Sequence, residues 1–212
     1  MSEEAKIAQG VLFSPGDPDL RAIKLRSHKL SAKYSRTNED DVEIRQHLIK
    51  LILAEFGEGS FMQGPIFFHY GRHTRIGKRC FINYNLTVQD DAAVRIGDDC
   101  NFGPNVTIVT PVHPLLPNER RVMYDQAGTP KHLCYAKPVT IGKDCWLGAN
   151  VVVCPGVTIG DNCVIGAGSV VTRDIPANSL AAGVPCKVIR QLSDADSMVN
   201  KPEISAGYQP HL

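Results

Sequence analysis

The histidine in the stretch "IVTPVHPLLP" has the residue type and the position best suited to acid–base chemistry. His113 stands between Pro111 and Pro114, at the start of a long loop. A neutral imidazole, with an ordinary pKa of about 6.5, can take a proton from a weakly nucleophilic hydroxyl near neutral pH. A lone loop histidine is more often solvent-facing than catalytic, so the assignment depends on what holds the loop.

The chain on either side of His113 repeats every six residues. Apolar residues recur at that interval, with one two-residue slip and the loop as interruptions, at Tyr70, Ile76, Ile82, Val88, Ile96, Phe102, Ile108, Ile141, Leu147, Val153, Ile159, Ile165 and Val171. Many units read I-G-x-x-C/V-x, as in "IGKDCW". A fixed short period is typical of a solenoid. Three hexads would form one triangular coil, and coils would stack about 4.8 Å apart as parallel strands.

Four of the seven cysteines occupy the same place in the hexad, at Cys80, Cys100, Cys145 and Cys163. That place requires a small apolar side chain, and free cysteine packs as one. The odd total argues against a closed disulfide framework. We therefore expect packing from these cysteines and neither metal nor redox chemistry.

Residues 17–56 lack the hexad and show helical periodicity. A first helix follows Asp17, and a second covers "DVEIRQHLIKLILAEF" and ends before Gly57. Thr37 or Asn38 is the expected cap of the second helix.

The expected organisation has three parts. They are a helical unit over 1–58, a β-solenoid over 59–192 with an extended loop over 109–137, and a polar tail over 193–212.

Composition excludes several classes of partner. The net charge is +1, and Lys and Arg are scattered, which argues against nucleic acid and an anionic membrane surface. No apolar run is long enough to span a bilayer. The start "MSEEAKIAQG" does not resemble a signal peptide, so we expect a cytoplasmic location.

Together the motifs resemble the hexapeptide-repeat sugar O-acetyltransferases, which include the maltose, galactoside and nodulation-factor enzymes. The resemblance covers nearly the whole chain and is carried by "GVLFSPGDPDLRAIKLRSHKL", "YGRHTRIG", "FINYNLTVQDD", "IGDDCNFGPNVTI", "VHP", "PVTIGKDCWLGANVVVCPGVTIGDNCVIGAGSVVTRDIP" and "AAGVPCKVIR". It implies a mainly β fold, a left-handed parallel β-helix with a small N-terminal α-helical domain. It also implies acetyl-CoA as co-substrate, no metal, a sugar or glycoside acceptor, and a homotrimer with active sites between subunits.

The resemblance implies a role for each matching residue. His113 matches the general base and Asn83 the asparagine at the reacting centre, and the backbone N–H of Ala149 matches the oxyanion donor. Asn83 also replaces the usual glycine of its hexad.

Coenzyme A contacts follow from the same resemblance. They are Trp146, Ala149, Ala167 and Thr172 along the pantetheine channel, and Arg173, Lys187 and Arg190 near the phosphates.

The implied acceptor contacts are Asp17, with Asp19 as its alternative, and His69, Phe81, Asn83, Asp91 and Met123. Two of them depart from the family pattern. His69 stands where Ser or Asp is usual, and Phe81 lacks a phenolic hydroxyl. The loop that contains Met123 is longer than in the galactoside enzyme.

Three alternatives remain open at this point. A zinc hydro-lyase of the γ-carbonic-anhydrase type would need His69, His73 and His113 to converge on one ion. A hexapeptide scaffold without activity would not need His113, Asn83 and Trp146 together. A xenobiotic O-acetyltransferase, of the chloramphenicol or streptogramin type, would lack the helical N-terminal domain.

Overall fold

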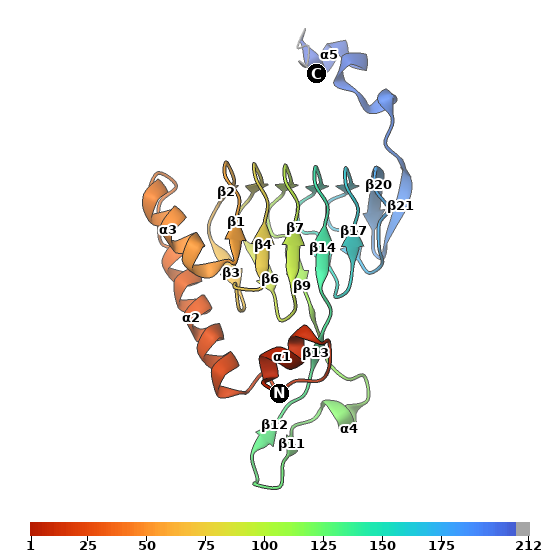
Figure 1. Cartoon of the computed structure of the whole chain (residues 1–212). Helices are drawn as coiled ribbons and strands as arrows, with labels where there is room; N and C mark the ends of the chain where they lie inside the picture. Colours follow the sequence, from red (N-terminus) through yellow and green to blue (C-terminus); the bar gives the residue numbers. More distant parts are fainter. Residues whose placement is uncertain (207–212) are drawn as a thin grey trace.

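The computed structural model describes residues 1–206, and its centre is a parallel β-solenoid built from three sheets (Figure 1). The first sheet contains β1 (Glu55–Phe56), β4 (Thr74–Ile76), β7 (Val94–Ile96), β14 (Val139–Ile141) and β17 (Thr158–Ile159). The second contains β2 (Phe61–Met62), β5 (Phe81–Ile82), β8 (Asn101–Phe102), β15 (Trp146–Leu147), β18 (Val164–Ile165), β20 (Ser179–Gly183) and β21 (Cys186–Gln191). The third contains β3 (Ile66–Phe68), β6 (Leu86–Gln89), β9 (Thr107–Val109), β16 (Val152–Val153) and β19 (Val170–Val171). The parallel solenoid expected from the hexads is confirmed.

The repeated apolar residues form the core. Ile82, Val88 and Ile108 are each 0% exposed, because every hexad turns its branched side chain inward. The four hexad cysteines are all at most 1% exposed. Each also lies within hydrogen-bonding distance of a carbonyl of the next coil or turn, as between Cys80 Sγ and the Gly97 oxygen at 3.2 Å. Their predicted packing role is confirmed.

The turns between the sheets make three corners, which we number by the sheet that precedes them. The left-handed residues at the first two corners are mostly Asn and Asp, such as Asn85 (φ 64°) and Asn105 (φ 61°). Asn85 donates its amide to Asn105 across coils at 2.9 Å. The hexad glycine Gly103 does not have a positive φ; it allows neighbouring coils to approach closely. A Cβ on Gly103 would come within 2.6 Å of the Ala149 nitrogen of the next coil.

Three helices precede and cap the solenoid: α1 (Glu3–Ala8), α2 (Pro18–Tyr34) and α3 (Val42–Ile52). Figure 1 shows α2 and α3 against one end of the rod, beside β1 to β3. Two expectations about α3 are wrong. Asp41 is its N-cap, and the helix ends at Ile52, because residues 55–56 pair with β4 as the first strand of the solenoid. The solenoid therefore begins before residue 59.

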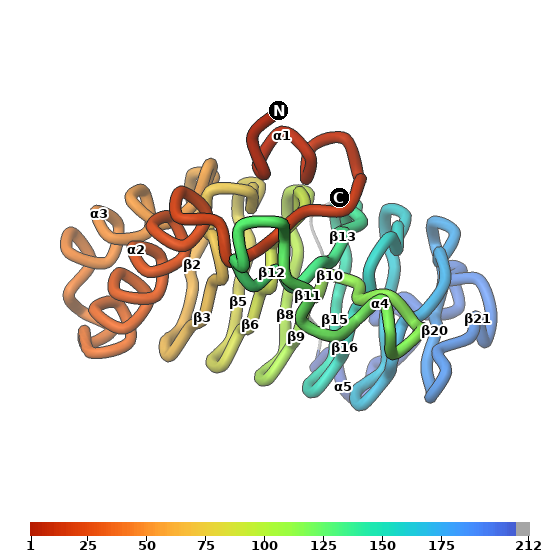
Figure 2. Tube along the Cα trace, turned by 90° about the horizontal axis from the view of Figure 1, so that it is seen from below, coloured from red at the N-terminus to blue at the C-terminus, as the bar shows by residue number. Residues whose placement is uncertain are grey.

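The loop between β9 and β14 is ordered by two small antiparallel pairs. At its base β10 (Pro111–Val112) pairs with β13 (Tyr135–Ala136). Farther out β11 (Met123–Tyr124) pairs with β12 (Pro130–Lys131), next to the short helix α4 (Pro117–Arg120). Figure 1 shows this loop extending beyond the solenoid on the side where α1 lies, and Figure 2, seen from that side, shows the loop in front of the strands. The loop is therefore a built element of the fold.

The described part of the predicted polar tail contains three short helices, η1 (Asp194–Asp196), η2 (Met198–Asn200) and α5 (Pro202–Ser205). The last six positions of the predicted tail, 207–212, lie outside the described residues. In residues 1–206 no helix has the length and apolar character needed to cross a membrane.

Candidate active site

The third corner of the solenoid is built around the carboxylate of Asp90. This side chain is 0% exposed. It accepts hydrogen bonds from the backbone N–H groups of Tyr70 (2.8 Å) and Gly71 (3.1 Å) and from the Thr74 hydroxyl (2.9 Å). Asp90 therefore fixes the chain that follows His69 and supports the corner from within.

Asp91, the predicted acceptor contact, has a different environment. It is 4% exposed, and it lines an open cavity of about 680 Å³ beneath α1 together with His73 and Arg95. Burial, and then the charge of Asp90, raise the pKa of Asp91 to about 6. A hydrogen bond from its own backbone N–H opposes this rise in the pKa of Asp91 without cancelling it. A buried carboxylate held at such a cost suits a binding site better than a structural corner.

We expect Asp91→Asn to stabilise the fold while weakening acceptor binding. Because the folded-state pKa is above the unfolded value of 3.8, the proton favours the folded form, and stability is lost as pH rises through about 6. The gain over the wild type should approach about 2–3 kcal/mol above neutral pH and should be smaller at about pH 5. Urea unfolding at both pH values measures it, and a gain that is independent of pH would contradict the assignment.

His69 lies on the same corner, directly after β3. Its ring packs edge-on against Tyr70 at 4.7 Å and tilts against His28 of α2 at 5.5 Å. Burial, followed by the charges of Lys24 and His28, lowers the pKa of His69 to about 4. His69 is therefore uncharged near neutral pH.

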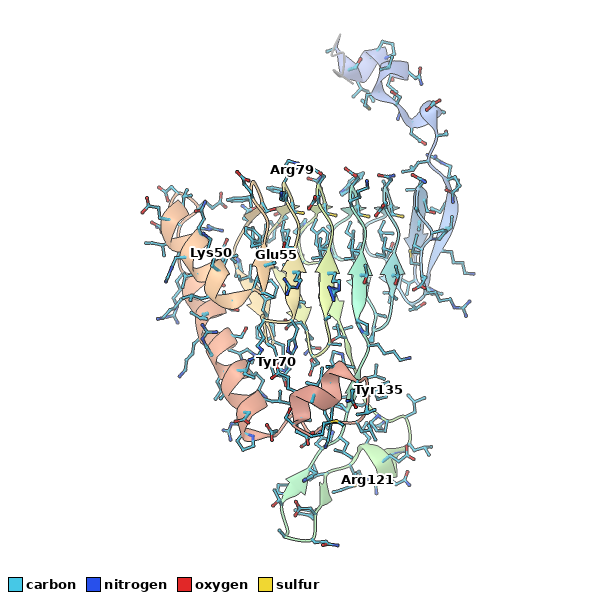
Figure 3. All side chains as sticks on the ribbon, viewed as in Figure 1. Lys50, Glu55, Tyr70, Arg79, Arg121 and Tyr135 are labelled. Carbon is cyan, nitrogen blue, oxygen red and sulfur yellow. The ribbon has the colours of Figure 1, made fainter. Side chains whose placement is uncertain are left out.

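Tyr70 and Asp17 also meet at this corner. Tyr70 is 2% exposed, and its hydroxyl has no hydrogen-bond partner among the described residues. Figure 3 shows Tyr70 at the rim of the rod, near α1. Asp17 is the N-cap of α2, where one carboxylate oxygen accepts from the N–H groups of Asp19 (3.0 Å) and Leu20 (3.3 Å). The capping role of Asp17 leaves its second oxygen outside these bonds.

The chain segment that carries His113 leaves the solenoid at the same corner, one coil after the coil of Asp91. Thr110 is 0% exposed and anchors the chain: its hydroxyl donates to the Gln89 carbonyl (2.8 Å) and accepts from the Ala92 N–H (2.9 Å). Beyond β10, His113 is exposed. Its ring stacks on that of His132 at 4.9 Å between centroids.

The second corner holds the remaining predicted catalytic residues. Asn83 occupies the place of Gly103 and Gly148 in later coils, and it accepts from the Tyr84 N–H at 2.9 Å, which leaves its amide NH₂ available. Within residues 1–206 the Ala149 N–H makes no hydrogen bond, as an oxyanion donor requires. Ala167 lies at the same corner, one coil farther along. A Cβ on Gly148 would come within 2.6 Å of the Ala167 nitrogen.

The outer face of the second sheet carries two predicted contacts. Phe81 is 41% exposed and stacks on Phe61, with ring centroids 6.0 Å apart. Trp146 is 57% exposed, in register with Asn101 and Val164 of the neighbouring strands. Large exposed rings on a flat sheet are typical of a surface that receives a ligand or another chain.

The predicted coenzyme-binding cations lie near the C-terminal end of the solenoid. Thr172 and Arg173 follow β19 and are exposed, and Lys187 and Arg190 are exposed on β21. Arg190 is engaged: its guanidinium binds the Asp196 carboxylate through two contacts, at 2.7 and 2.5 Å.

Within one chain, the predicted site residues that lie at the corners form two separate groups. Asp17, His69, Asp91 and His113 belong to the third corner and its loop, whereas Asn83, Ala149 and Ala167 belong to the second corner. The third sheet separates these corners. Met123, 39% exposed, lies out on the hairpin of the loop.

Within the described part of one chain, the three histidines of the zinc alternative do not gather into one group. A zinc site requires three ligands on one ion. No three His, Cys, Asp or Glu side chains of the described chain, residues 1–206, gather in that way. The Nδ1 of His73 instead lies 2.8 Å from the Asp90 carbonyl.

Sequence reasoning missed several residues of this corner. Asp90 and Asp91 are identical in type and adjacent, so nothing local separates the structural carboxylate from the one facing the cavity. Thr110 ends a hexad and gave no signal. The stack of His132 on His113 depends on how the loop folds, and the sequence pattern does not indicate it.

Known proteins share both the sequence and the fold. Family profiles described as a maltose acetyltransferase hexapeptide capping motif and a hexapeptide repeat of succinyl-transferase match residues 6–57 and residues 93–113 and 138–173. Galactoside O-acetyltransferase of Escherichia coli K12 is 42% identical over 90% of each chain. The structure of a galactoside acetyltransferase in complex with coenzyme A has 42% identity and a TM-score of 0.84, covering 92% of this chain and 94% of that one. A maltose O-acetyltransferase from Clostridium difficile 630 has 35% identity and a TM-score of 0.84, covering 92% and 99%. The chain therefore belongs to the family of hexapeptide-repeat acetyltransferases that includes the galactoside and maltose O-acetyltransferases.

Proposed function

We propose that this protein transfers an acetyl group from acetyl-CoA to a hydroxyl of a sugar or glycoside, with His113 as general base. The observation that carries the proposal is the third corner, where Thr110 anchors the chain that leads to the exposed His113 and where Asp91, one coil earlier, lines an open cavity. Membership of the family and the similarity to a protein solved with coenzyme A support acetyl-CoA as the donor.

In the proposed reaction the acceptor hydroxyl attacks the thioester carbonyl directly. The neutral imidazole of His113 takes the hydroxyl proton as the new C–O bond forms. The Ala149 N–H stabilises the negative charge that develops on the carbonyl oxygen. Collapse of the tetrahedral intermediate breaks the C–S bond, and the proton passes to the departing thiolate, which leaves as coenzyme A.

The two corners suit a site shared between subunits. His113 and Asn83 lie at different corners of one chain, so a complete site needs the second corner of a neighbouring copy beside the third corner of the first. A closed ring of three copies gives each interface the same pair of surfaces. We therefore propose a homotrimer with three equivalent active sites.

The donor and the acceptor class are tested together. Incubation with acetyl-CoA and a panel of sugars, glycosides and antibiotics, with thiol release followed, should give turnover with carbohydrate hydroxyls. Turnover confined to the antibiotics would replace the sugar acceptor with a xenobiotic one. No thiol release with any acceptor would refute the proposed function.

Coenzyme A recognition makes a second prediction. Because Asp196 holds the Arg190 guanidinium, Asp196→Asn should free that group for the phosphates and lower the KM for acetyl-CoA about two- to fivefold, the range for an exposed ion pair. Arg173→Ala should raise the same KM, and the affinity should weaken with salt. An unchanged KM for acetyl-CoA in Arg173→Ala, Lys187→Ala and Arg190→Ala would contradict the assignment.

A third prediction concerns the choice of acceptor. His69→Ser replaces an uncharged imidazole between His28 and Tyr70 with a smaller hydroxyl, which enlarges the predicted acceptor pocket. We expect the ranking of acceptors to change while the KM for acetyl-CoA stays constant. Relative kcat/KM values across the sugar panel measure this, and an unaltered ranking would make His69 a structural residue.

A further inference from the structure

The loop extension places a second imidazole on the proposed base. The rings of His113 and His132 are nearly parallel, at 21° between planes and 4.9 Å between centroids. Both residues are exposed, so the stack covers one face of the His113 ring and leaves the remainder accessible. Within residues 1–206 no side-chain hydrogen bond of either ring is found, and the stack is an aromatic contact that can orient the His113 side chain.

The backbone that carries His113 is held independently of this stack. Thr110 ties the chain to the solenoid through its hydroxyl, and its carbonyl accepts from the Lys137 N–H at 2.9 Å, closing the base of the loop. Val112 then pairs with Tyr135 in the β10–β13 ladder. These contacts fix the Cα of His113 and leave its χ1 and χ2 angles to be set by neighbouring side chains.

The backbone that carries His132 is held from both sides. Two residues later, Cys134 exchanges backbone hydrogen bonds with Phe13 of the N-terminal segment, at 2.8 and 3.1 Å, and both are buried. One residue earlier, Lys131 pairs with Met123 in the outer hairpin and lies 3.6 Å from Asp125. His132 therefore has a defined position against which a mobile ring can pack.

We propose that His132 is a positioning residue, whose stacked ring holds the imidazole of His113 in the orientation that the acetyl transfer requires. This rests on the proposed function, because it takes His113 as the base. An exposed imidazole without a hydrogen-bonded partner samples several rotamers, and a stacked aromatic ring selects one of them. A base loses efficiency when its nitrogen is not aimed at the proton, since orientation is a large part of catalysis.

Substitutions at position 132 separate ring stacking from other roles. His132→Ala removes the ring and should lower kcat about tenfold, which corresponds to about 1.4 kcal/mol. His132→Phe keeps a flat ring without a titratable nitrogen and should retain most of the wild-type kcat. The KM for acetyl-CoA should not change in either variant. His47→Ala, which removes an exposed histidine on α3, is the matched control and should leave kcat unchanged.

Nuclear magnetic resonance tests the stack without reference to activity. The ring-current shift that His132 causes on the His113 ring protons should disappear in His132→Ala and persist in His132→Phe. Loss of kcat in both variants, or full kcat in His132→Ala, would overturn the positioning role. Full activity in His113→Ala would overturn it together with the base assignment, whereas failure of the acceptor panel would refute the proposed function itself.

Discussion

His113→Ala should lower kcat by about 10²–10⁴-fold, the usual range for loss of a positioned general base. The acceptor hydroxyl would then have to lose its proton to water while it attacks the thioester. Steady-state thiol release with saturating acetyl-CoA and acceptor measures the effect. The fold should survive, because His113 is exposed and the anchoring contacts of the corner belong to Thr110.

Binding of acetyl-CoA provides the control for this variant. Trp146, the one tryptophan of the chain, is 57% exposed in the predicted coenzyme channel, so its fluorescence can report binding. The Kd for acetyl-CoA should be the same in His113→Ala and in the wild type, because none of the predicted phosphate contacts is altered. A folded variant with undiminished kcat would show that another group takes the proton.

The solenoid was predictable from sequence because each hexad repeats the same pattern of inward-facing and turn residues. An inward branched residue such as Ile82, a small residue such as Cys80 and a turn residue such as Asn85 recur with the same burial or backbone geometry in successive coils. Any one hexad would be a weak signal. The repetition makes it strong, because a parallel coil can bury a continuous core only when neighbouring coils keep the same register.

The end of α3 was not predictable because local and tertiary preferences compete there. Residues 53–56 continue the helical pattern, yet Gly57 donates to the Ile76 carbonyl and Glu55 pairs with Arg75. Adding a strand to an exposed sheet edge satisfies backbone groups that a further helical turn would leave at that edge. Helix propensity alone therefore does not predict that α3 ends at Ile52.

The sequence places many candidate site residues at positions in the hexad register, but it did not predict the division of these residues between two corners. The hexad register places Asn83 and His113 on the solenoid, and the structure puts them at its second and third corners, on either side of the third sheet. A reaction that uses both groups on one substrate therefore requires two chains. This arrangement makes the proposed trimer testable through activity as well as through mass.

Mixing two inactive variants should restore activity. His113→Ala lacks the base at the third corner, and Asn83→Ala lacks the amide at the second corner, so each homotrimer carries the same defect in every site. If each site takes His113 from one chain and Asn83 from its neighbour, unfolding and refolding an equal mixture should leave about a quarter of the sites intact, since random assembly pairs two unmutated corners with that frequency. Thiol release by the mixture should then exceed that of either parent by one or more orders of magnitude. Sedimentation equilibrium should give three times the chain mass of 23.2 kDa for both parents and the mixture. A trimer without restored activity would place both residues in the same chain's site, and a monomer would remove the shared site altogether.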